Sequence, residues 1–219
     1  MLRGVRLIIL GKQGAGKGTQ CVQLGRHYVV PHISTGDMFR AARKSGTEMG
    51  RLADSYMSRG ELVPDEVVIG VVAERLAERD ARGRGFILDG FPRTVHQASA
   101  LEKILAPVTL DAVLDLDVAT PLVLNRLASR RMCSVCGNNY SVQLPPKHNW
   151  TCDHCGGEVL QRDDDKPDAI QRRLDLYEEQ TRPLLAFYER RSLLGVIDGS
   201  QPEDTVFEAC VAYIDAARQ

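Results

Sequence analysis

The sequence lacks several features that would each point to a class of protein. Its 219 residues carry a net charge of −1, so it has no basic excess for binding nucleic acid through phosphates. No segment approaches the roughly 20 apolar residues of a membrane-spanning helix, and residues 1–10 form too short an apolar run for a signal peptide. We therefore expect a cytoplasmic protein that binds neither nucleic acid nor membranes.

Several catalytic patterns are missing as well. The sequence contains no Asn-Lys-x-Asp motif for reading guanine, and no Ser/His/Asp or Cys/His arrangement of a covalent nucleophile stands out. It has neither internal repeats nor a low-complexity tract. With 43% hydrophobic and 26% charged residues, the chain is long enough for one α/β core with inserted segments.

Short aliphatic segments alternate with long helical patterns along most of the chain. This alternation predicts an α/β fold in which helices wrap a parallel sheet. We predict five strands in one sheet, at Val5 to Leu10, Pro31 to Ser34, Phe86 to Asp89, Ala112 to Asp117 and Leu194 to Asp198. The clearest helical patterns are Gln20 to Tyr28, Asp65 to Arg82 and Pro121 to Arg131.

Two segments interrupt the alternation. Residues 34–63 are helical in pattern, with breaks at Gly46 and Gly60, and residues 130–165 are rich in turn-forming residues. Both are interpreted as lobes inserted into a core. The predicted core therefore consists of residues 1–33, 64–129 and 166–219.

The most specific motif follows the first predicted strand. Residues Gly11 to Thr19 read Gly-Lys-Gln-Gly-Ala-Gly-Lys-Gly-Thr, a phosphate-binding loop between a strand and a helix. Such a loop turns backbone N–H groups and a helix N-terminus toward phosphate, and Lys17 adds a positive charge. The hydroxyl that usually follows this lysine and ligates Mg²⁺ is replaced by Gly18, and a hydroxyl appears one residue later, at Thr19. The sequence therefore predicts a nucleotide phosphate site with unusual Mg²⁺ ligation.

Four of the six cysteines form two close pairs. Cys133 and Cys136 are separated from Cys152 and Cys155 by fifteen residues, which is the spacing of a four-thiolate zinc site. Because four protein ligands leave no open position, we expect a structural metal, zinc first and iron as the alternative. His148 and His154 are interpreted as exposed loop residues. The remaining two cysteines, Cys21 and Cys210, lie in helical patterns and are expected in the core.

Two carboxylates are candidates for holding Mg²⁺ or its waters. Asp89 ends a predicted strand beside the loop, the position that P-loop enzymes use for this purpose, although it could instead cap the next turn. Asp37 fits two roles equally, as a helix N-cap or as a second water-holding carboxylate.

Arginines gather near segment ends and in the two inserted segments. On one helix, Arg126 and Arg130 would present two guanidinium groups on the same face, since they are four residues apart. Such a set suits transfer between two polyphosphates, where charge and alignment stabilise the transition state. The six arginines are Arg40, Arg93, Arg126, Arg130, Arg162 and Arg173.

An acidic run precedes Pro167. Asp163, Asp164 and Asp165 suit the N-terminus of a helix, where acidic groups meet the positive end of the helix dipole. Helix capping is the expected role. Alternatively, these carboxylates orient neighbouring guanidinium groups.

Several motifs, in order, resemble the adenylate kinases of the long-lid, zinc-containing bacterial type. They cover essentially the whole chain. The matching stretches are residues 14–20, residues 34–40, residues 85–94 with Gln97, residues 130–137, and residues 196–199.

The resemblance implies a P-loop nucleoside monophosphate kinase fold in which residues 34–63 bind AMP and residues 130–165 form a lid. On the donor side it assigns ATP to Gly14, Ala15, Gly16, Lys17, Gly18, Thr19, Arg130, Asn139, Tyr140 and Gln201. On the acceptor side it assigns AMP to Thr35, Arg40, Glu61, Leu62, Val63, Gly90, Phe91, Pro92, Arg93, Gln97, Arg162 and Arg173.

The implied reaction is reversible transfer of the ATP γ-phosphoryl group to AMP, giving two ADP. The resemblance gives catalytic roles to Lys17, Asp89, Arg93, Arg126, Arg130, Arg162 and Arg173, with Mg²⁺ held through water by Asp37 and Asp89. A monomer with a structural zinc is expected. The alternatives are another nucleoside monophosphate kinase, a kinase that uses GTP as donor and, more distantly, a P-loop ATPase or switch whose zinc ribbon binds nucleic acid.

The chain departs from the family pattern within its loop. Lys12 and Gln13 stand where Pro-Pro or Ala-Pro is usual, a change that would loosen the turn or add charge near the phosphates. Gln201 stands where lysine is frequent, and a backbone contact to adenine would survive that change.

Overall fold

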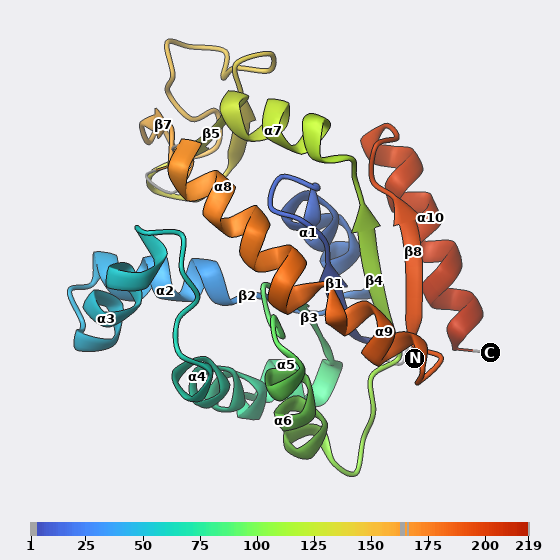
Figure 1. Cartoon of the computed structure of the whole chain (residues 1–219). Coiled ribbons are helices and arrows are strands. Elements are labelled where there is room, and N and C mark those ends of the chain that lie inside the picture. Colours follow the sequence, from blue (N-terminus) through green and yellow to red (C-terminus); the bar gives the residue numbers. More distant parts are fainter. Residues whose placement is uncertain (1–3, 163–164, 166, 219) are drawn as a thin grey trace.

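A parallel sheet of five strands forms the centre of the computed structural model, which describes residues 4–162, 165 and 167–218 (Figure 1). This confirms the predicted α/β fold. In spatial order the strands are β2 (His32–Ser34), β3 (Phe86–Asp89), β1 (Arg6–Leu10), β4 (Ala112–Asp117) and β8 (Leu194–Asp198). The carboxyl ends of these parallel strands meet at one edge, where ligands bind in open α/β sheets.

Alternating side chains of β1 bury both faces of the sheet. Leu7 and Ile9 pack into one apolar cluster with α1 and α10, whereas Ile8 and Leu10 pack into a second cluster with α4 and α6. Such two-sided burial explains why this strand reads as a continuous aliphatic run.

Helices cover both faces, and among the described residues none is long and apolar enough to cross a membrane. The helices of the core are α1 (Lys17–Tyr28), α4 (Asp65–Ala77), α5 (Arg79–Arg84), α6 (Val95–Leu105), α7 (Thr120–Ser129), α8 (Pro167–Leu176), the π-helix η2 (Tyr177–Thr181), α9 (Pro183–Glu189) and α10 (Glu203–Ala217).

Two predicted helices end earlier than their patterns suggested. The pattern of Asp65 to Arg82 is divided into α4 and α5, because the backbone of Glu78 is extended. Arg75 bridges this break with bonds of 2.8 and 2.7 Å to the Asp80 carboxylate, which also accepts the N–H of Ala81. Similarly, α7 stops at Ser129, and Arg130 begins a strand.

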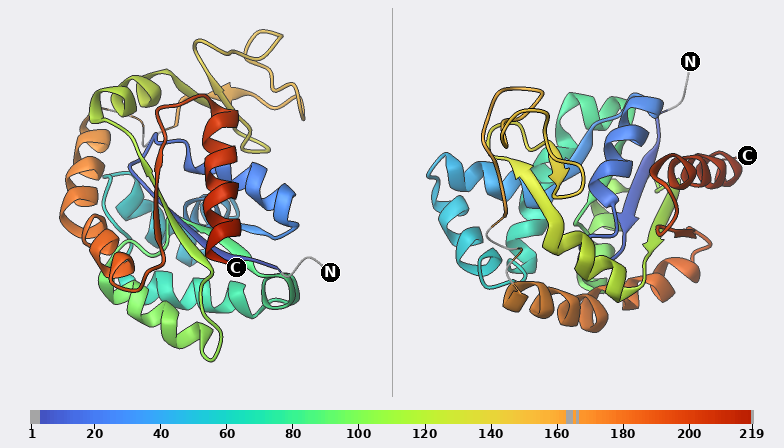
Figure 2. Two further views of the ribbon diagram at one scale, coloured as in Figure 1. Left: turned by 90° about the vertical axis from the view of Figure 1, so that its right-hand side faces the viewer. Right: turned by 90° about the horizontal axis from the view of Figure 1, so that it is seen from above.

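Two lobes stand out beside the carboxyl ends of the strands (Figures 1 and 2). We call residues 35–57 the helical hairpin, which consists of α2 (Thr35–Lys44) and α3 (Glu48–Met57) on either side of Gly46. We call residues 130–162 the cysteine lobe, which contains an antiparallel sheet of β5 (Arg130–Cys133), β6 (Asn139–Ser141) and β7 (Val159–Leu160).

Candidate functional site

The phosphate-binding loop joins β1 to α1 and is shaped by its glycines. Gly14 has a φ of +85°, and a Cβ there would lie 2.9 Å from the Cγ atom of Leu127. Gly16 has a φ of +101° and precedes the first residue of α1. Both conformations disfavour side chains, so the loop can present its backbone closely to a ligand. At Gly18, by contrast, the nearest atom to an added Cβ is Asp89 Oδ2, at 4.0 Å.

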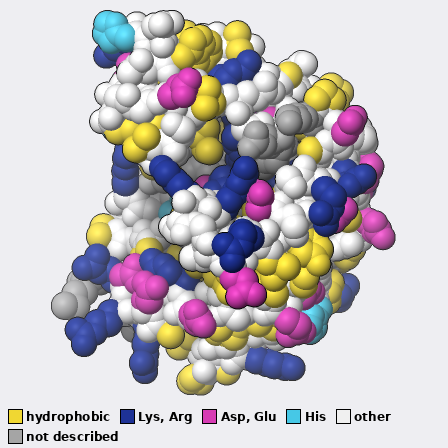
Figure 3. Space-filling view, turned by 90° about the vertical axis from the view of Figure 1, so that its left-hand side faces the viewer, with side chains coloured by type: hydrophobic (Ala, Val, Ile, Leu, Met, Phe, Trp, Pro, Cys, Tyr) yellow, Lys and Arg dark blue, Asp and Glu magenta, His cyan; other side chains and the backbone are white. Residues whose placement is uncertain are grey.

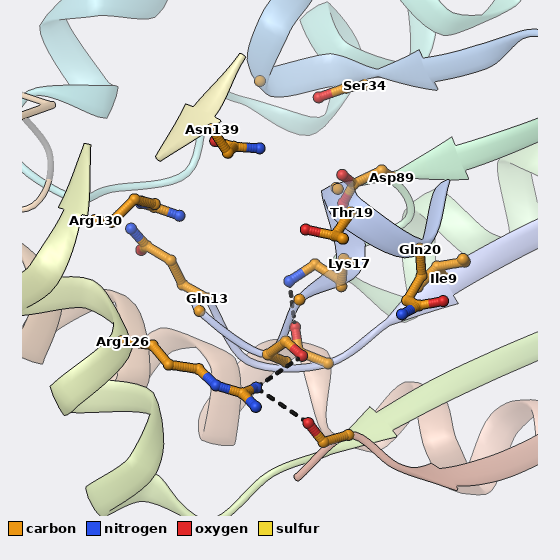
Figure 4. Close-up of a pocket in the computed structure, with 18 of the residues that line it drawn as sticks. Ile9, Gln13, Lys17, Thr19, Gln20, Ser34, Asp89, Arg126, Arg130 and Asn139 are labelled. Atoms are coloured by element: carbon orange, nitrogen blue, oxygen red, sulfur yellow. Dashed lines mark hydrogen bonds between the residues drawn. The ribbon is translucent and has the colours of Figure 1, made fainter. Parts of the chain in front are cut away.

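Lys17 lies over the loop. Its ammonium group donates hydrogen bonds to the carbonyl oxygens of Gly11 and Lys12, at 2.7 and 2.9 Å. Burial lowers the pKa of Lys17 to about 8, although the Asp89 carboxylate opposes part of this shift. Figure 4 shows Lys17, Thr19 and Asp89 on the same side of the loop. A bound phosphate would stabilise the charged form of this lysine.

Asp89 lies at the carboxyl end of β3, in register with Ile9 of β1 and Ser34 of β2. Burial alone would raise its pKa, but the neighbouring His32 and Lys17 leave it below the ordinary value. His32 Nε2 lies 3.5 Å from Asp89 Oδ2. Cys21, which is fully buried as expected, brings its sulfur within 4.8 Å of both groups. The carboxylate is therefore held ionised beside the loop.

The helix cap assigned to Asp37 is wrong. Ser34 is the N-cap of α2, and its hydroxyl accepts a hydrogen bond of 3.3 Å from the Asp37 N–H. The Asp37 carboxylate is mostly exposed, forms an ion pair with Arg40 and faces the same cavity as the loop. Its second predicted role, holding water around Mg²⁺, stays a prediction.

The prediction that Arg126 and Arg130 share one helix face is wrong, because α7 ends between them. Arg126 donates to the carbonyl oxygens of Ala15 and Gly199, at 3.3 and 3.0 Å (Figure 4). Arg130 instead turns to Asp165 and donates 2.8 Å from Nε to Oδ2, while Nη2 bonds Oδ1.

Asp165 therefore orients a guanidinium group, which was the alternative to its predicted role in helix capping. Its side chain is buried, and the arginine pair compensates the charge. Asp163 and Asp164, the other members of the acidic run, lie outside the described residues.

A second polar cluster surrounds a small pocket of about 30 Å³. Thr35 donates its hydroxyl to the Gly90 carbonyl oxygen at 3.0 Å. Gln97 is buried, accepts the Arg93 N–H at 2.7 Å and donates to Asp65 at 2.7 Å. These bonds fix the orientation of the Gln97 amide at the edge of the pocket.

Glu61 connects the end of the helical hairpin to α8. Its carboxylate lies 2.8 Å from Arg59 and 3.3 Å from Arg172, and both neighbours favour its ionised form, so that its pKa is lowered. Nearby, a Cβ on Gly60 would lie 2.8 Å from the Ala169 carbonyl oxygen of α8. The helical hairpin thus returns to the core in close contact with α8.

A cavity of about 560 Å³ joins the loop, both lobes and α8. On this side of the molecule Lys and Arg side chains gather around a hollow (Figure 3). The predicted site residues that line the cavity are Gly14, Ala15, Gly16, Lys17, Gly18, Thr19, Asp37, Arg40, Leu62, Asp89, Gly90, Pro92, Arg93, Arg126, Arg130, Asn139, Tyr140, Arg162, Arg173 and Gln201. Thr35, Glu61, Val63 and Gln97 line the small pocket beside it, whereas Phe91 lies in the apolar core and lines neither.

The four paired cysteines converge as their spacing predicted. The sulfurs of Cys133 and Cys155 are 3.4 Å apart, those of Cys136 and Cys152 are 3.6 Å apart, and all four lie within 4.8 Å of one another. Four ligands about 2.3 Å from one zinc ion would be about 3.8 Å apart, so the site fits zinc. A hydrogen bond from Tyr140 is the main cause that lowers the pKa of Cys152 to about 6, toward the thiolate that metals bind.

Sequence reasoning missed two residues of the site. His32 reaches Asp89 from the neighbouring strand, and the only available signal was its place in the least pronounced strand pattern. Gln13 was noted as a departure, but its partners are 152 and 160 residues away. No local pattern reveals such contacts.

This chain is similar to known proteins over most of its length. The family model described as Adenylate kinase matches residues 9–193. The adenylate kinase of Thermodesulfovibrio yellowstonii is 48% identical over 214 residues, which cover 96% of this chain and 99% of the relative. That of Methanosarcina mazei is 49% identical over 213 residues, covering 96% and 98%, and that of Desulfitobacterium hafniense is 52% identical over 200 residues, covering 90% and 92%. Because the family model matches residues 9–193 and these relatives are 48% to 52% identical over 90% or more of this chain, the chain belongs to the adenylate kinase family.

Proposed function

We propose that this protein catalyses the reversible transfer of the ATP γ-phosphoryl group to AMP, giving two ADP. The observation that carries the proposal is the single cavity that runs from the phosphate-binding loop to Gly90, Arg93 and Arg173. Such a cavity has room for two phosphorylated groups facing each other. Direct in-line transfer needs no covalent intermediate on the protein.

On the donor side, we propose that the loop and Lys17 hold the ATP phosphates, and that Arg130, Asn139 and Tyr140 approach them from the cysteine lobe. Gln201 follows β8 and would contact adenine through its backbone. Its side chain donates 2.7 Å to Asp198, so it is occupied within the protein. The negative charge of the transferring phosphoryl group would be neutralised by three further arginines, Arg126, Arg162 and Arg173.

On the acceptor side, AMP would lie between the helical hairpin and the turn after β3. Thr35 and Gln97 would face adenine, and Arg40 and Arg93 would bind the phosphate. Glu61, Leu62 and Val63 would line the pocket, along with Gly90 and Pro92. In this proposal Phe91 contributes packing from the core.

Two metal ions are part of the proposal. Mg²⁺, held through water by Asp89 and Asp37, would neutralise phosphate charge, and both carboxylates face the cavity that contains the loop. Zinc would be bound by Cys133, Cys136, Cys152 and Cys155 and would hold the shape of the cysteine lobe as a lid. The helical hairpin and the lid would close over the nucleotides and exclude water.

A coupled assay of ATP with AMP, run beside zinc quantification, tests this proposal. We expect ADP to form in proportion to both substrates, with about one zinc ion per chain. Replacing AMP by UMP or CMP, and ATP by GTP, separates the proposed activity from its neighbours. Preference for UMP or CMP as acceptor would refute the assignment. The monomeric state, the cytoplasmic location and the lack of nucleic-acid binding stay predictions.

A further inference from the structure

Lys12 and Gln13, which replace the residues usual at these positions in the family, point in different directions. Lys12 turns away from the site, because its ammonium group donates to the Val118 carbonyl oxygen at 3.3 Å and lies 3.7 Å from Glu178. Gln13 turns inward, and Figure 4 shows its side chain extending from the loop toward Arg130. Only the second of the two residues therefore bears on the cavity.

The Gln13 amide has a different partner at each end. Its Nε2 group donates 2.9 Å to Asp165 Oδ1, and its Oε1 atom accepts 2.8 Å from Arg173 Nη1. The reverse orientation would bring an amide N–H₂ against a guanidinium group and an amide oxygen against a carboxylate. The partners thus determine which way the amide points.

The hydrogen bond from Gln13 stabilises the Asp165 carboxylate, whose side chain is fully buried. Arg130 supplies two of its hydrogen bonds, and Gln13 supplies a third. A buried carboxylate that loses a donor carries an uncompensated cost of desolvation. Without Gln13, the carboxylate is expected to shift, and Arg130 to shift with it.

We infer that Gln13 is a positioning residue, which aligns the Asp165–Arg130 pair and Arg173 over the phosphate-binding loop before nucleotides bind. The inference rests on the proposed phosphotransfer. Both ends of the amide are occupied within the protein, so Gln13 acts through the two arginines and not on phosphate itself. It connects the loop to the base of the cysteine lobe and to α8.

Steady-state kinetics of the full chain tests this inference. Displacement by about 1 Å can cost about 100-fold in rate, and we expect Gln13→Ala to lower kcat about tenfold, because Asp165 retains both bonds to Arg130. KM for ATP and AMP should change less than about twofold, since alignment matters most in the transition state. The matched control is Gln171→Ala, which removes an exposed amide on α8 that donates to Asp175 at 2.9 Å.

A second pair of variants isolates the bond between Gln13 and Asp165. Gln13→Glu places two carboxylates against each other, and Asp165→Asn replaces one of the two oxygens that accept from Arg130 by an N–H₂ group, so both should lower kcat. Combined, they restore a complementary donor and acceptor. We expect the combined loss to be at least about tenfold smaller than the product of the single losses, as for residues in direct contact.

The outcomes are distinguishable. If the unmodified chain forms no ADP, the proposed function fails. If it is active and Gln13→Ala matches it in kcat, or if the two single losses simply multiply, the positioning role is refuted. Thermal unfolding of each variant separates poor folding from misalignment, and the combined variant keeps the test valid if Gln13→Ala is unstable.

Discussion

The two lobes around the cavity are held together in different ways. The cysteine lobe buries only a small cluster, in which Val159 and Tyr140 pack with two of the cysteines. The helical hairpin instead inserts Phe39 and Ala53 into the apolar cluster under the central sheet. A lobe with so few buried apolar groups needs another source of stability, whereas a lobe that shares the core needs none. We therefore predict that a bound metal stabilises the cysteine lobe, whereas packing against the core stabilises the helical hairpin.

Removing one metal ligand should have the largest effect. Cys133→Ala is expected to abolish zinc binding and unfold the cysteine lobe, since structural zinc contributes about 10 kcal/mol or more to folding. Hydrogen exchange should then lose protection across residues 130–160, with protection of the central strands retained. The matched control is Cys210→Ala, a buried core cysteine on α10, which should keep its zinc and lose about 1 kcal/mol. Retained protection in Cys133→Ala would contradict the comparison.

Truncating the anchor of the helical hairpin should affect the whole protein. Phe39 is 4% exposed, and Phe39→Ala is expected to lower the free energy of unfolding by about 3 kcal/mol in urea. Zinc content should stay the same. Leu52→Ala, on the same hairpin but 42% exposed, is the control and should change stability by less than about 0.5 kcal/mol. A loss of zinc without a loss of global stability would reverse the assignment of the two lobes.

The two sides of the cavity should also differ in their response to pH. Below pH 8 Lys17 is charged in the free protein, so the affinity for ATP should not depend on this group. Bound phosphate raises its pKa, and above pH 8 affinity should fall up to tenfold per pH unit as the free lysine loses its proton. Calorimetric titration with a non-hydrolysable ATP analogue measures this, with AMP as the comparison.

AMP affinity should change little over the same range, because Lys17 lies on the loop side of the cavity. The control variant is Lys17→Arg, whose charge persists to high pH, and its affinity for the analogue should be flat from pH 7 to 9.5 within about twofold. An equal decline in that variant would assign the titration to another group.

The smallest predicted effect concerns a helix cap within the hairpin. The Thr47 hydroxyl accepts 3.1 Å from the Gly50 N–H at the start of α3. Thr47→Ala should reduce the protection of α3 amides by about 1 kcal/mol and leave the cysteine lobe unchanged. Ser55→Ala, at an exposed position in the last turn of α3, should cause no loss. An equal effect at both positions would show that the cap contributes nothing.

The sequence correctly predicted the features that depend on residues close together in the chain. The predicted strands match the five strands of the central sheet, although the three strands of the cysteine lobe were not predicted, and the loop and the cysteine pairs were located by spacing alone. The resemblance to adenylate kinases is confirmed as well. Each of these features depends on residues close together in the chain.

The wrong predictions concern features that depend on contacts between residues far apart in the chain. The end of α7 at Ser129 follows from the pairing of Arg130 with Ser141 in the antiparallel sheet and with Asp165. The pairing of Asp165 with Arg130 was likewise only an alternative, because its partner is 35 residues away in the chain. No periodicity in the sequence encodes these partners.

Helix α8 has a consequence for how the affinities for the two substrates depend on each other. It begins where the cysteine lobe returns to the core, and it also contacts the exit of the helical hairpin through Arg172 and Ala169. We expect a displacement of this helix by one lobe to be transmitted to the attachment of the other. Binding of the two nucleotides would then be thermodynamically linked, and each would change the affinity for the other by the same factor.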